Sequence, residues 1–310
     1  MRPERGDGVS APSLASAAGR SQTGAILLML AASLAFATMD ACAKHLTADY
    51  SVAQITWARN VFHMLLLPFL FGLRRPWALA RTGQPLLQLG RSALLLAGSY
   101  IFFLALSFMP LADATSITFL SPLVVTVMSV PLLGEKVGPR RWAAVAVGFG
   151  GVLLIVRPGL GAAHWAAALP LLCAVFFAFG QVSARMLSRT DGAVTTLFYS
   201  GLAGALVMSA IVPFDWRSPD LEGWVLMIAV GLAGGIAHYL MIRAFAAAPA
   251  SLLAPFGYVQ LVWATLAGLL IFGDFPDGPT LLGIALIAGS GLYVLYRERR
   301  LALERSKPRP

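Results

Sequence analysis

The chain has 310 residues, of which 58% are hydrophobic and only 12% are charged, and its mean hydropathy is +0.77. A soluble globular domain is about 25% charged and about 45–50% apolar. The composition therefore excludes a disordered chain and a disulfide scaffold, and it argues against an ordinary cytosolic enzyme. A soluble protein of this size cannot bury so many apolar side chains in one core, whereas a lipid bilayer can solvate them.

Ten apolar runs follow one another along the chain. A membrane-crossing helix needs about 20 largely apolar residues, so we predict an all-α integral membrane protein with ten transmembrane helices. Residues 1–22 are predicted to be a disordered cytoplasmic tail, and residues 297–310 a basic cytoplasmic tail. Ala41-Cys42-Ala43 loosely imitates a signal-peptide cleavage site, but the preceding run is too long for a signal core. The predicted spans cover residues 23–46, 52–72, 86–108, 112–133, 141–156, 164–188, 192–212, 222–246, 251–272 and 280–296.

Polar residues inside the first five spans are candidates for a binding site, because an ionisable group within hydrocarbon is costly. Asp40 in the first span is a candidate proton-coupling carboxylate or amine binder, or one half of a structural ion pair with Arg59. Arg59 and His63 are four residues apart in the second span and share a helix face. Arg59 could hold a carboxylate or phosphate, or it could reach the outer interface while His63 bonds a neighbouring helix. Tyr100 in the third span is a further candidate.

The last five spans add four candidate substrate-binding residues. Gln181 lies in the sixth span and His238 in the eighth, where the imidazole could bind substrate or titrate near neutral pH. Tyr258 and Gln260 lie near the cytoplasmic end of the ninth span and could contact substrate in an inward-open state. For each of the four, hydrogen bonding between helices is the alternative interpretation.

The basic residues predict the orientation of the chain. With the N-terminus placed inside, 19 of the 23 Lys and Arg residues fall on the cytoplasmic side. The four on the outer side are Lys44, Arg59, Arg157 and Arg217. The positive-inside rule therefore favours cytoplasmic N- and C-termini. The net charge of +9 belongs to these short connections, so we expect no nucleic-acid partner.

The two halves of the chain resemble each other. With a displacement of 139 residues, Ala105 meets Ala244, Pro110 meets Pro249 and Gly134 meets Gly273; with a displacement of 141, Asp40 meets Gln181. Each half has five predicted spans, an odd number, so the second half must enter the membrane from the opposite side. We predict two inverted five-helix repeats at 23–156 and 164–296, an arrangement that many secondary transporters use. Pro122 and Pro255 predict kinks in corresponding spans.

Several motifs resemble those of the EamA-type drug/metabolite transporters, over about residues 24–296. The resemblance rests on Phe36-Ala37-Thr38-Met39-Asp40 leading to Lys44, on Arg59, on Leu111-Ala112-Asp113-Ala114 and on Leu133-Gly134-Glu135-Lys136. The second half departs from the last motif with Gly273-Asp274-Phe275-Pro276, although an acidic residue is retained. The resemblance implies ten helices, termini inside, a central cavity lined by helices 1–4 and 6–9, and a bacterial inner membrane. It leaves the substrate open among amino acids, vitamins, nucleosides, cofactors and drugs.

We therefore predict a secondary transporter that moves a small organic metabolite by alternating access. The expected partners are that metabolite and the bilayer, with the protein a monomer or a weak homodimer. We expect no cofactor, because the sequence has no Walker loop, and no metal, because its four His are scattered. A membrane enzyme acting on a lipid-linked substrate would need longer, more polar loops. A channel would show repeated polar stripes or a charged ring.

Overall fold

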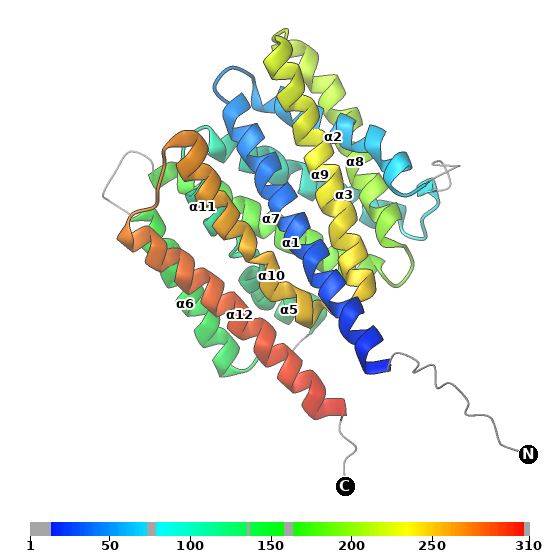
Figure 1. The fold of residues 1–310 in the computed structure, drawn as a ribbon, viewed down its shortest axis with the longest axis vertical. Coiled ribbons are helices and arrows are strands. Elements are labelled where there is room, and N and C mark those ends of the chain that lie inside the picture. Colours follow the sequence, from blue (N-terminus) through cyan, green and yellow to red (C-terminus); the bar gives the residue numbers. More distant parts are fainter. Residues whose placement is uncertain (1–13, 73–78, 135–136, 158–163, 307–310) are drawn as a thin grey trace, which may run out of the picture.

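The computed structural model describes residues 14–72, 79–134, 137–157 and 164–306. Over these ranges the chain is helical and contains no strand (Figure 1), which confirms the predicted all-α class. The helices are α1 (Leu14–Leu46), α2 (Val52–Leu70), α3 (Pro85–Leu106), α4 (Leu111–Thr118), α5 (Ser121–Leu133), α6 (Pro139–Val156), α7 (Ala168–Leu187), α8 (Ala193–Ile211), α9 (Leu221–Ala247), α10 (Ala250–Gly257), α11 (Val259–Phe272) and α12 (Gly278–Ser306), with short 3-10 turns at His164–Ala167 and Val212–Asp215.

Nine stretches of the described residues are long and apolar enough to cross a membrane, whereas the sequence predicts ten. The difference is α2, which has 19 residues but buries polar side chains that include Gln54, Asn60 and His63. These groups face the neighbouring helices α3, α8 and α9 rather than the surface. A polar helix that is enclosed in this way can lie within a bilayer, so a tenth crossing by α2 stays a prediction.

The two ends of the chain are more helical than predicted. Helix α1 begins at Leu14, so the predicted disordered tail is wrong for residues 14–22; an alanine-rich stretch there favours helix. Residues 1–13 lie outside the described part of the chain. Helix α12 continues to Ser306 and takes up most of the predicted basic tail. The start of α1 and the end of α12 lie at the same end of the bundle (Figure 1), as an even number of crossings requires.

Two of the predicted spans are broken in the middle. The span predicted at 112–133 consists of α4 and α5, which are separated at Phe119 and Leu120; the span at 251–272 consists of α10 and α11, which meet at Tyr258. Pro122 stands in the first turn of α5 and Pro255 inside α10. Each proline removes a backbone hydrogen bond, so the prolines contribute to breaks between helices and not only to kinks.

The helix boundaries repeat between the two halves. Displacing α4 by 139 residues gives the bounds of α10, and displacing α2 by 141 residues gives the bounds of α8. Each copy of α4 is preceded by a proline N-cap with an extended ψ, Pro110 at 145° and Pro249 at 144°. Each copy of α5 ends on a left-handed glycine, Gly134 at φ 65° and Gly273 at φ 72°. The internal similarity of the sequence is therefore a similarity of structure.

The contacts between the halves occur in exchanged pairs. Helix α1 packs on α9 as α7 packs on α3, and α1 packs on α11 as α7 packs on α5. Helix α2 also packs on its own equivalent, α8, and α6 packs on α12. Contacts that are exchanged between the two halves in this way indicate that an approximate two-fold axis relates the halves.

Large apolar side chains cover much of the outer surface. Phe69 is 83% exposed, Leu86 84% and Leu270 79%. Water-facing surfaces of monomeric proteins rarely carry apolar patches of this extent. The exposed surface therefore fits contact with lipid tails.

Helices α6 and α12 form a separate pair along one edge of the bundle (Figure 1). They approach most closely at Gly151 and Gly283. A Cβ atom on Gly151 would lie 2.7 Å from the Gly283 carbonyl oxygen, and a Cβ on Gly283 would lie 2.6 Å from the Gly151 carbonyl oxygen. No larger residue fits at either position without moving the helices.

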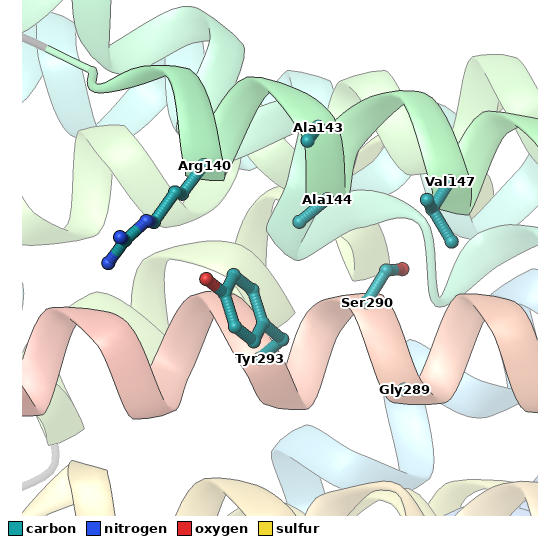
Figure 2. A pocket seen from close by; sticks show the side chains of 7 residues that line it. All are labelled: Arg140, Ala143, Ala144, Val147, Gly289, Ser290 and Tyr293. Carbon is teal, nitrogen blue, oxygen red and sulfur yellow. The ribbon is translucent and has the colours of Figure 1, made fainter.

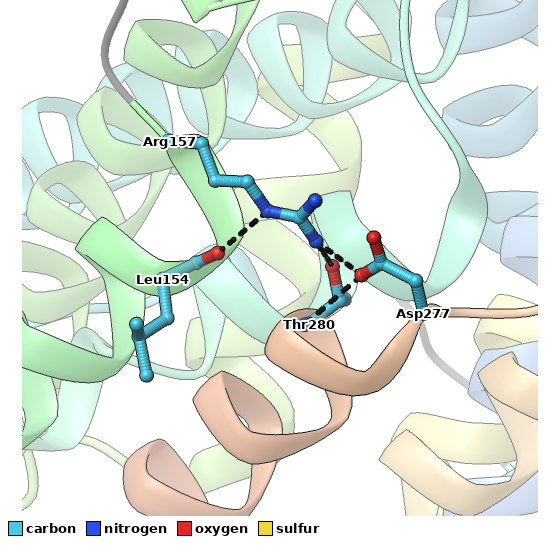
Figure 3. A network of polar contacts seen from close by, with 4 residues as sticks. All are labelled: Leu154, Arg157, Asp277 and Thr280. Carbon is cyan, nitrogen blue, oxygen red and sulfur yellow. Dashed lines mark hydrogen bonds and ion pairs between the residues drawn. The ribbon is translucent and has the colours of Figure 1, made fainter. Parts of the chain in front are cut away.

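The two ends of this pair differ. At the end nearer Gly151, Arg157 binds the Asp277 carboxylate, donates to Thr280 Oγ1 at 3.1 Å and donates to the Leu154 carbonyl oxygen at 3.2 Å (Figure 3). Hydrogen bonds from Arg157 and Thr280 lower the pKa of Asp277 to about 2. The other end opens into a groove of about 340 Å³. Figure 2 shows the groove, whose lining consists of Arg140, Ala143, Ala144, Val147, Gly289, Ser290 and Tyr293.

Candidate functional site

Asp40 is buried at the contact between α1 and α11, with a 3% exposed side chain. Gln260 on α11 donates from Nε2 to Asp40 Oδ2 at 3.2 Å. The structure therefore brings together two residues that lie 220 positions apart and that the sequence predicts separately as substrate-binding. One amide donor does not saturate a carboxylate, which has about four acceptor sites.

Gln181 makes the corresponding contact on the other side of the axis. Its Nε2 donates to Ser121 Oγ at 3.4 Å, between α7 and α5. Gln181 is the repeat equivalent of Asp40, and Ser121 is the repeat equivalent of Gln260. The two hydrogen bonds are therefore related by the approximate two-fold axis, but one of them contains a carboxylate and the other is neutral.

Arg59 does not form the predicted structural ion pair. Among the described residues, no Asp40 oxygen lies within 4.0 Å of an Arg59 nitrogen, and Arg59 Nη1 instead donates to Ser99 Oγ at 3.2 Å. Arg59 is still near enough to interact electrostatically with Asp40 and with both His63 and His238. A hydrogen bond to α3 thus positions the Arg59 guanidinium near Asp40 and the two histidines.

The two histidines of the bundle interior stack on each other. The rings of His63 on α2 and His238 on α9 are 5.4 Å apart with an interplanar angle of 30°, and Phe36 lies edge-on to His238 at 4.9 Å. His238 Nδ1 is 2.8 Å from the Gly234 carbonyl oxygen, so that nitrogen carries the proton. The structure thus brings together two histidines that the sequence predicts separately as substrate-binding.

The two helix breaks contact each other through their aromatic side chains. The rings of Phe119 and Tyr258, which are repeat equivalents, are 5.3 Å apart. The Tyr258 ring passes over α12 at Gly291, where a Cβ atom would lie only 1.7 Å from the hydroxyl oxygen. The Tyr258 hydroxyl therefore fits against α12 only because residue 291 is glycine.

Eight buried side-chain polar atoms have no hydrogen-bond partner within the described chain, and three of them belong to predicted site residues. These three are Arg59 Nε, His63 Nε2 and Tyr258 Oη. Buried polar groups are paired in the great majority of cases, and an unpaired one costs roughly 1–3 kcal/mol. The unpaired atoms on Arg59, which interacts electrostatically with Asp40, and on His63, which interacts electrostatically with Arg59, are therefore suited to a ligand that supplies the missing donors and acceptors. Tyr258 Oη lies against Gly291 of α12.

Tyr100 is not part of this group. It packs against the main apolar core, and no hydrogen bond joins its hydroxyl to another residue of the described ranges. Its position in α3 places it one residue beyond Ser99, on a different face of the helix from the residue that holds Arg59. Within the described chain no hydrogen bond, ion pair or ring contact joins Tyr100 to the other seven predicted site residues.

Arg91 lies within the predicted span 86–108 and was counted from the sequence only as a positive charge on the cytoplasmic side, not as a candidate site residue. Helix α3 begins at Pro85, so Arg91 lies in its second turn. Its Nε donates to the Gly180 carbonyl oxygen on α7 at 3.2 Å, and its Nη1 donates to Ser200 Oγ on α8 at 2.8 Å. The structure therefore adds Arg91 to the polar groups that connect α3 with α7 and α8.

The described residues contain no group of three or more His, Cys, Asp or Glu side chains that could hold a metal ion. The two cysteines, Cys42 and Cys173, are both free thiols. The chemistry that this region offers is therefore hydrogen bonding, charge and aromatic contact.

Comparison with known proteins matches the chain to a family. The model of the EamA-like transporter family matches residues 23–157 and 164–296. The chain is similar to a solved crystal structure with a TM-score of 0.60 and 24% identity, covering 92% of this chain and 99% of that one. This last similarity concerns the fold alone.

Three curated relatives are transporters. The riboflavin transporter of Rhizobium johnstonii is 31% identical over 296 residues, covering 93% of this chain and 96% of the relative. The S-adenosylmethionine uptake transporter of Rickettsia bellii is 28% identical over 262 residues, covering 84% and 89%. The pseudopaline exporter of Pseudomonas aeruginosa is 31% identical over 266 residues, covering 84% and 92%. This chain therefore belongs to the EamA-like transporter family and is a multi-pass membrane transporter of a small metabolite.

Proposed function

We propose that the protein is a secondary transporter that works by alternating access around Asp40, Arg59, His63, His238, Gln181, Tyr258 and Gln260. The helices cross the membrane ten times as two inverted units, 23–156 and 164–296. Both termini are cytoplasmic, and the membrane is a bacterial inner membrane. Two copies of one bundle related by a two-fold axis have two equivalent packings that open to opposite sides, which is the physical basis of alternating access. The protein works as a monomer or weak homodimer.

We further propose a flat, uncharged heterocycle rich in hydrogen-bonding groups as the substrate, with riboflavin as the first compound to test. The observation that carries this choice is the set of unpaired buried atoms on Arg59, His63 and Tyr258. The His63 ring lies against His238, which Phe36 contacts edge-on, and Tyr258 lies against Phe119; such aromatic contacts suit a planar ring. The riboflavin transporters of Rhizobium johnstonii and Vibrio cholerae are relatives of this chain and support the choice.

A cationic substrate such as S-adenosylmethionine fits the same region less well. Asp40 would attract a cation, but Arg59 and Arg91 both interact electrostatically with the central His238. Two guanidinium groups against one carboxylate disfavour a positively charged ligand. The uptake activity of the relative from Rickettsia bellii makes it the second compound to test.

The test is transport by purified protein in liposomes. We expect saturable riboflavin uptake that is accelerated by unlabelled riboflavin on the opposite side, because a carrier with one site exchanges substrate faster than it returns empty. Tyr100→Phe serves as the control variant and keeps this activity. Uptake that rises linearly with concentration would indicate a pore. Saturable uptake of S-adenosylmethionine without riboflavin uptake would show that the protein is a carrier whose substrate is S-adenosylmethionine and not riboflavin.

A further inference from the structure

Arg91 is a charged residue within the bundle that has no carboxylate partner in the described part of the chain. The ion pairs there join His45 with Glu222 and Arg157 with Asp277. Arg91 uses two donors on the Gly180 carbonyl oxygen and the Ser200 hydroxyl. A guanidinium has five donors in a planar fork, so donors are left for another partner. An ionisable side chain at membrane depth is costly and is a functional hypothesis by default.

The repeat shows where this guanidinium lies. Arg59 Nη1 bonds Ser99 at 3.2 Å on one side of the axis. The repeat equivalents of Arg59 and Ser99 are Ser200 and His238. Arg91 Nη1 bonds Ser200 at 2.8 Å and interacts electrostatically with His238. Arg91 therefore supplies a guanidinium at the place where the two-fold operation would put that of Arg59, although it comes from α3 instead of α8.

The depths of the two arginines also match. Arg59 is the eighth residue of α2, counted from the end that we predict to be outside, and Arg91 is the seventh residue of α3, counted from the predicted cytoplasmic end. At 1.5 Å per residue, each lies roughly 9–11 Å along its helix from the corresponding membrane surface. Asp40 is the seventh residue from the outer end of α1, so Arg59 lies at about the depth of Asp40, and Arg91 lies nearer the predicted cytoplasmic side.

We infer that Arg91 is a substrate-binding residue of the cytoplasm-facing state and takes the role there that Arg59 takes in the outward-facing state. It binds acceptor oxygens of the substrate, either the paired carbonyls of a heterocycle or a carboxylate or phosphate, through the fork geometry of the guanidinium. This inference rests on the proposed carrier function, and Ser200 positions Arg91 for it.

The first experiment measures binding from each side. Riboflavin exchange is assayed in right-side-out and inverted vesicles that contain the wild type, Arg91→Ala, Arg91→Lys or Arg59→Ala. We expect Arg91→Ala to raise the half-saturating concentration about tenfold or more from the cytoplasmic side and less than threefold from outside. Arg59→Ala should show the opposite asymmetry. Arg91→Lys keeps the charge, so it controls for misfolding. Equal effects of Arg91→Ala on both sides would overturn the inference.

The second experiment requires no known substrate, so it distinguishes failure of the inference from failure of the riboflavin proposal. Ser200→Cys is introduced into a protein whose Cys42 and Cys173 are replaced by alanine. Anionic and cationic water-soluble thiol reagents are then added from the cytoplasmic side. A neighbouring guanidinium raises the local concentration of anions, so we expect the anionic reagent to react about tenfold faster, relative to the cationic one, than after Arg91→Ala. A ratio unchanged by Arg91→Ala would contradict a guanidinium that faces the cytoplasmic solution.

Discussion

The hydrogen bonds Asp40–Gln260 and Gln181–Ser121 occupy equivalent places on the two sides of the approximate two-fold axis, yet only the first contains an ionisable group. The first joins α1 to α11 and the second joins α7 to α5. The scaffold has kept its symmetry at the level of helices and hydrogen bonds, while the chemistry has become different on the two sides. A symmetric scaffold supplies two alternative packings, and an asymmetric charge supplies a group that can respond to substrate or protons in both of them.

The most direct test of this difference between the two hydrogen bonds is to replace the Asp40 carboxylate. Asp40→Asn keeps the shape of the side chain and can still accept from Gln260, so both hydrogen bonds become neutral. A hydrogen bond to a charged group is worth about 1.5–3 kcal/mol, and we expect the half-saturating substrate concentration to rise about tenfold or more. If Asp40 couples protons, the dependence of transport on pH also disappears. The measurement is initial uptake in liposomes between pH 5 and pH 8.

Gln181→Ala is the matched control for Asp40→Asn, because it removes the neutral member of the symmetric pair. We expect a smaller effect on uptake than that of Asp40→Asn and an unchanged dependence on pH, because Gln181 has no ionisable group. An Asp40→Asn protein with the pH dependence of the wild type would remove Asp40 from proton coupling. Equal losses in the two variants would show that the carboxylate has no special role.

The close contact of α6 with α12 offers a second way to test the two-fold arrangement. In Gly151→Ala the new Cβ would lie 2.7 Å from the Gly283 carbonyl oxygen, so the helices must separate. Overpacking of this kind typically costs about 1–3 kcal/mol, and we expect a lower melting temperature in detergent. Gly150→Ala is the control on the same helix, because a Cβ there meets nothing within 4 Å. Equal stability of the two variants would contradict the packing of α6 on α12.

Tyr258 and Phe119 allow the asymmetry to be removed without a change in ring size. Tyr258→Phe places the same ring at both breaks and removes a buried hydroxyl that has no partner in the described chain. We expect the empty protein to become more stable by about 1 kcal/mol and substrate binding to weaken by a few fold, because the hydroxyl is unpaired only without substrate. Thermal unfolding with and without riboflavin measures both effects. A variant that is less stable when empty would indicate that the hydroxyl has a partner.

The sequence predicts the membrane helices and the repeat well, because both depend on periodic or local features. Apolar runs predict ten spans, and nine of them are long and apolar enough in the described structure to cross a membrane. Displacements of 139 and 141 residues predict the matching helix bounds. The breaks at Phe119 and Tyr258 are harder to predict, because proline inside a membrane helix is compatible with a kink as well as with a break.

The candidate site is only partly visible in the sequence. Asp40 is recognisable because a carboxylate in an apolar run is rare, and Gln181 because it is the repeat equivalent of Asp40. The contact of Asp40 with Gln260 depends on how α1 packs on α11, which no local pattern encodes. Arg91 was missed as a candidate site residue because it was counted only for the orientation of the chain. The repeat would have indicated it only through Ser200, which is the equivalent of Arg59 and lacks its charge.

The smallest effect is expected at the end of α6 and α12, where Arg157 binds Asp277 and Thr280 outside the apolar span (Figure 3). These contacts lower the pKa of Asp277 from its ordinary value of 3.8 to about 2. A lowered pKa in the folded state contributes stability above the ordinary value, and that stability is lost as the pH falls through the lowered one. Because the pair is exposed, Asp277→Asn should lower the melting temperature at pH 7 by no more than about 3 °C. The difference between wild type and variant should shrink between about pH 4 and pH 2. A difference that stays constant over this range would show that the carboxylate charge of Asp277 does not stabilise this end of the pair.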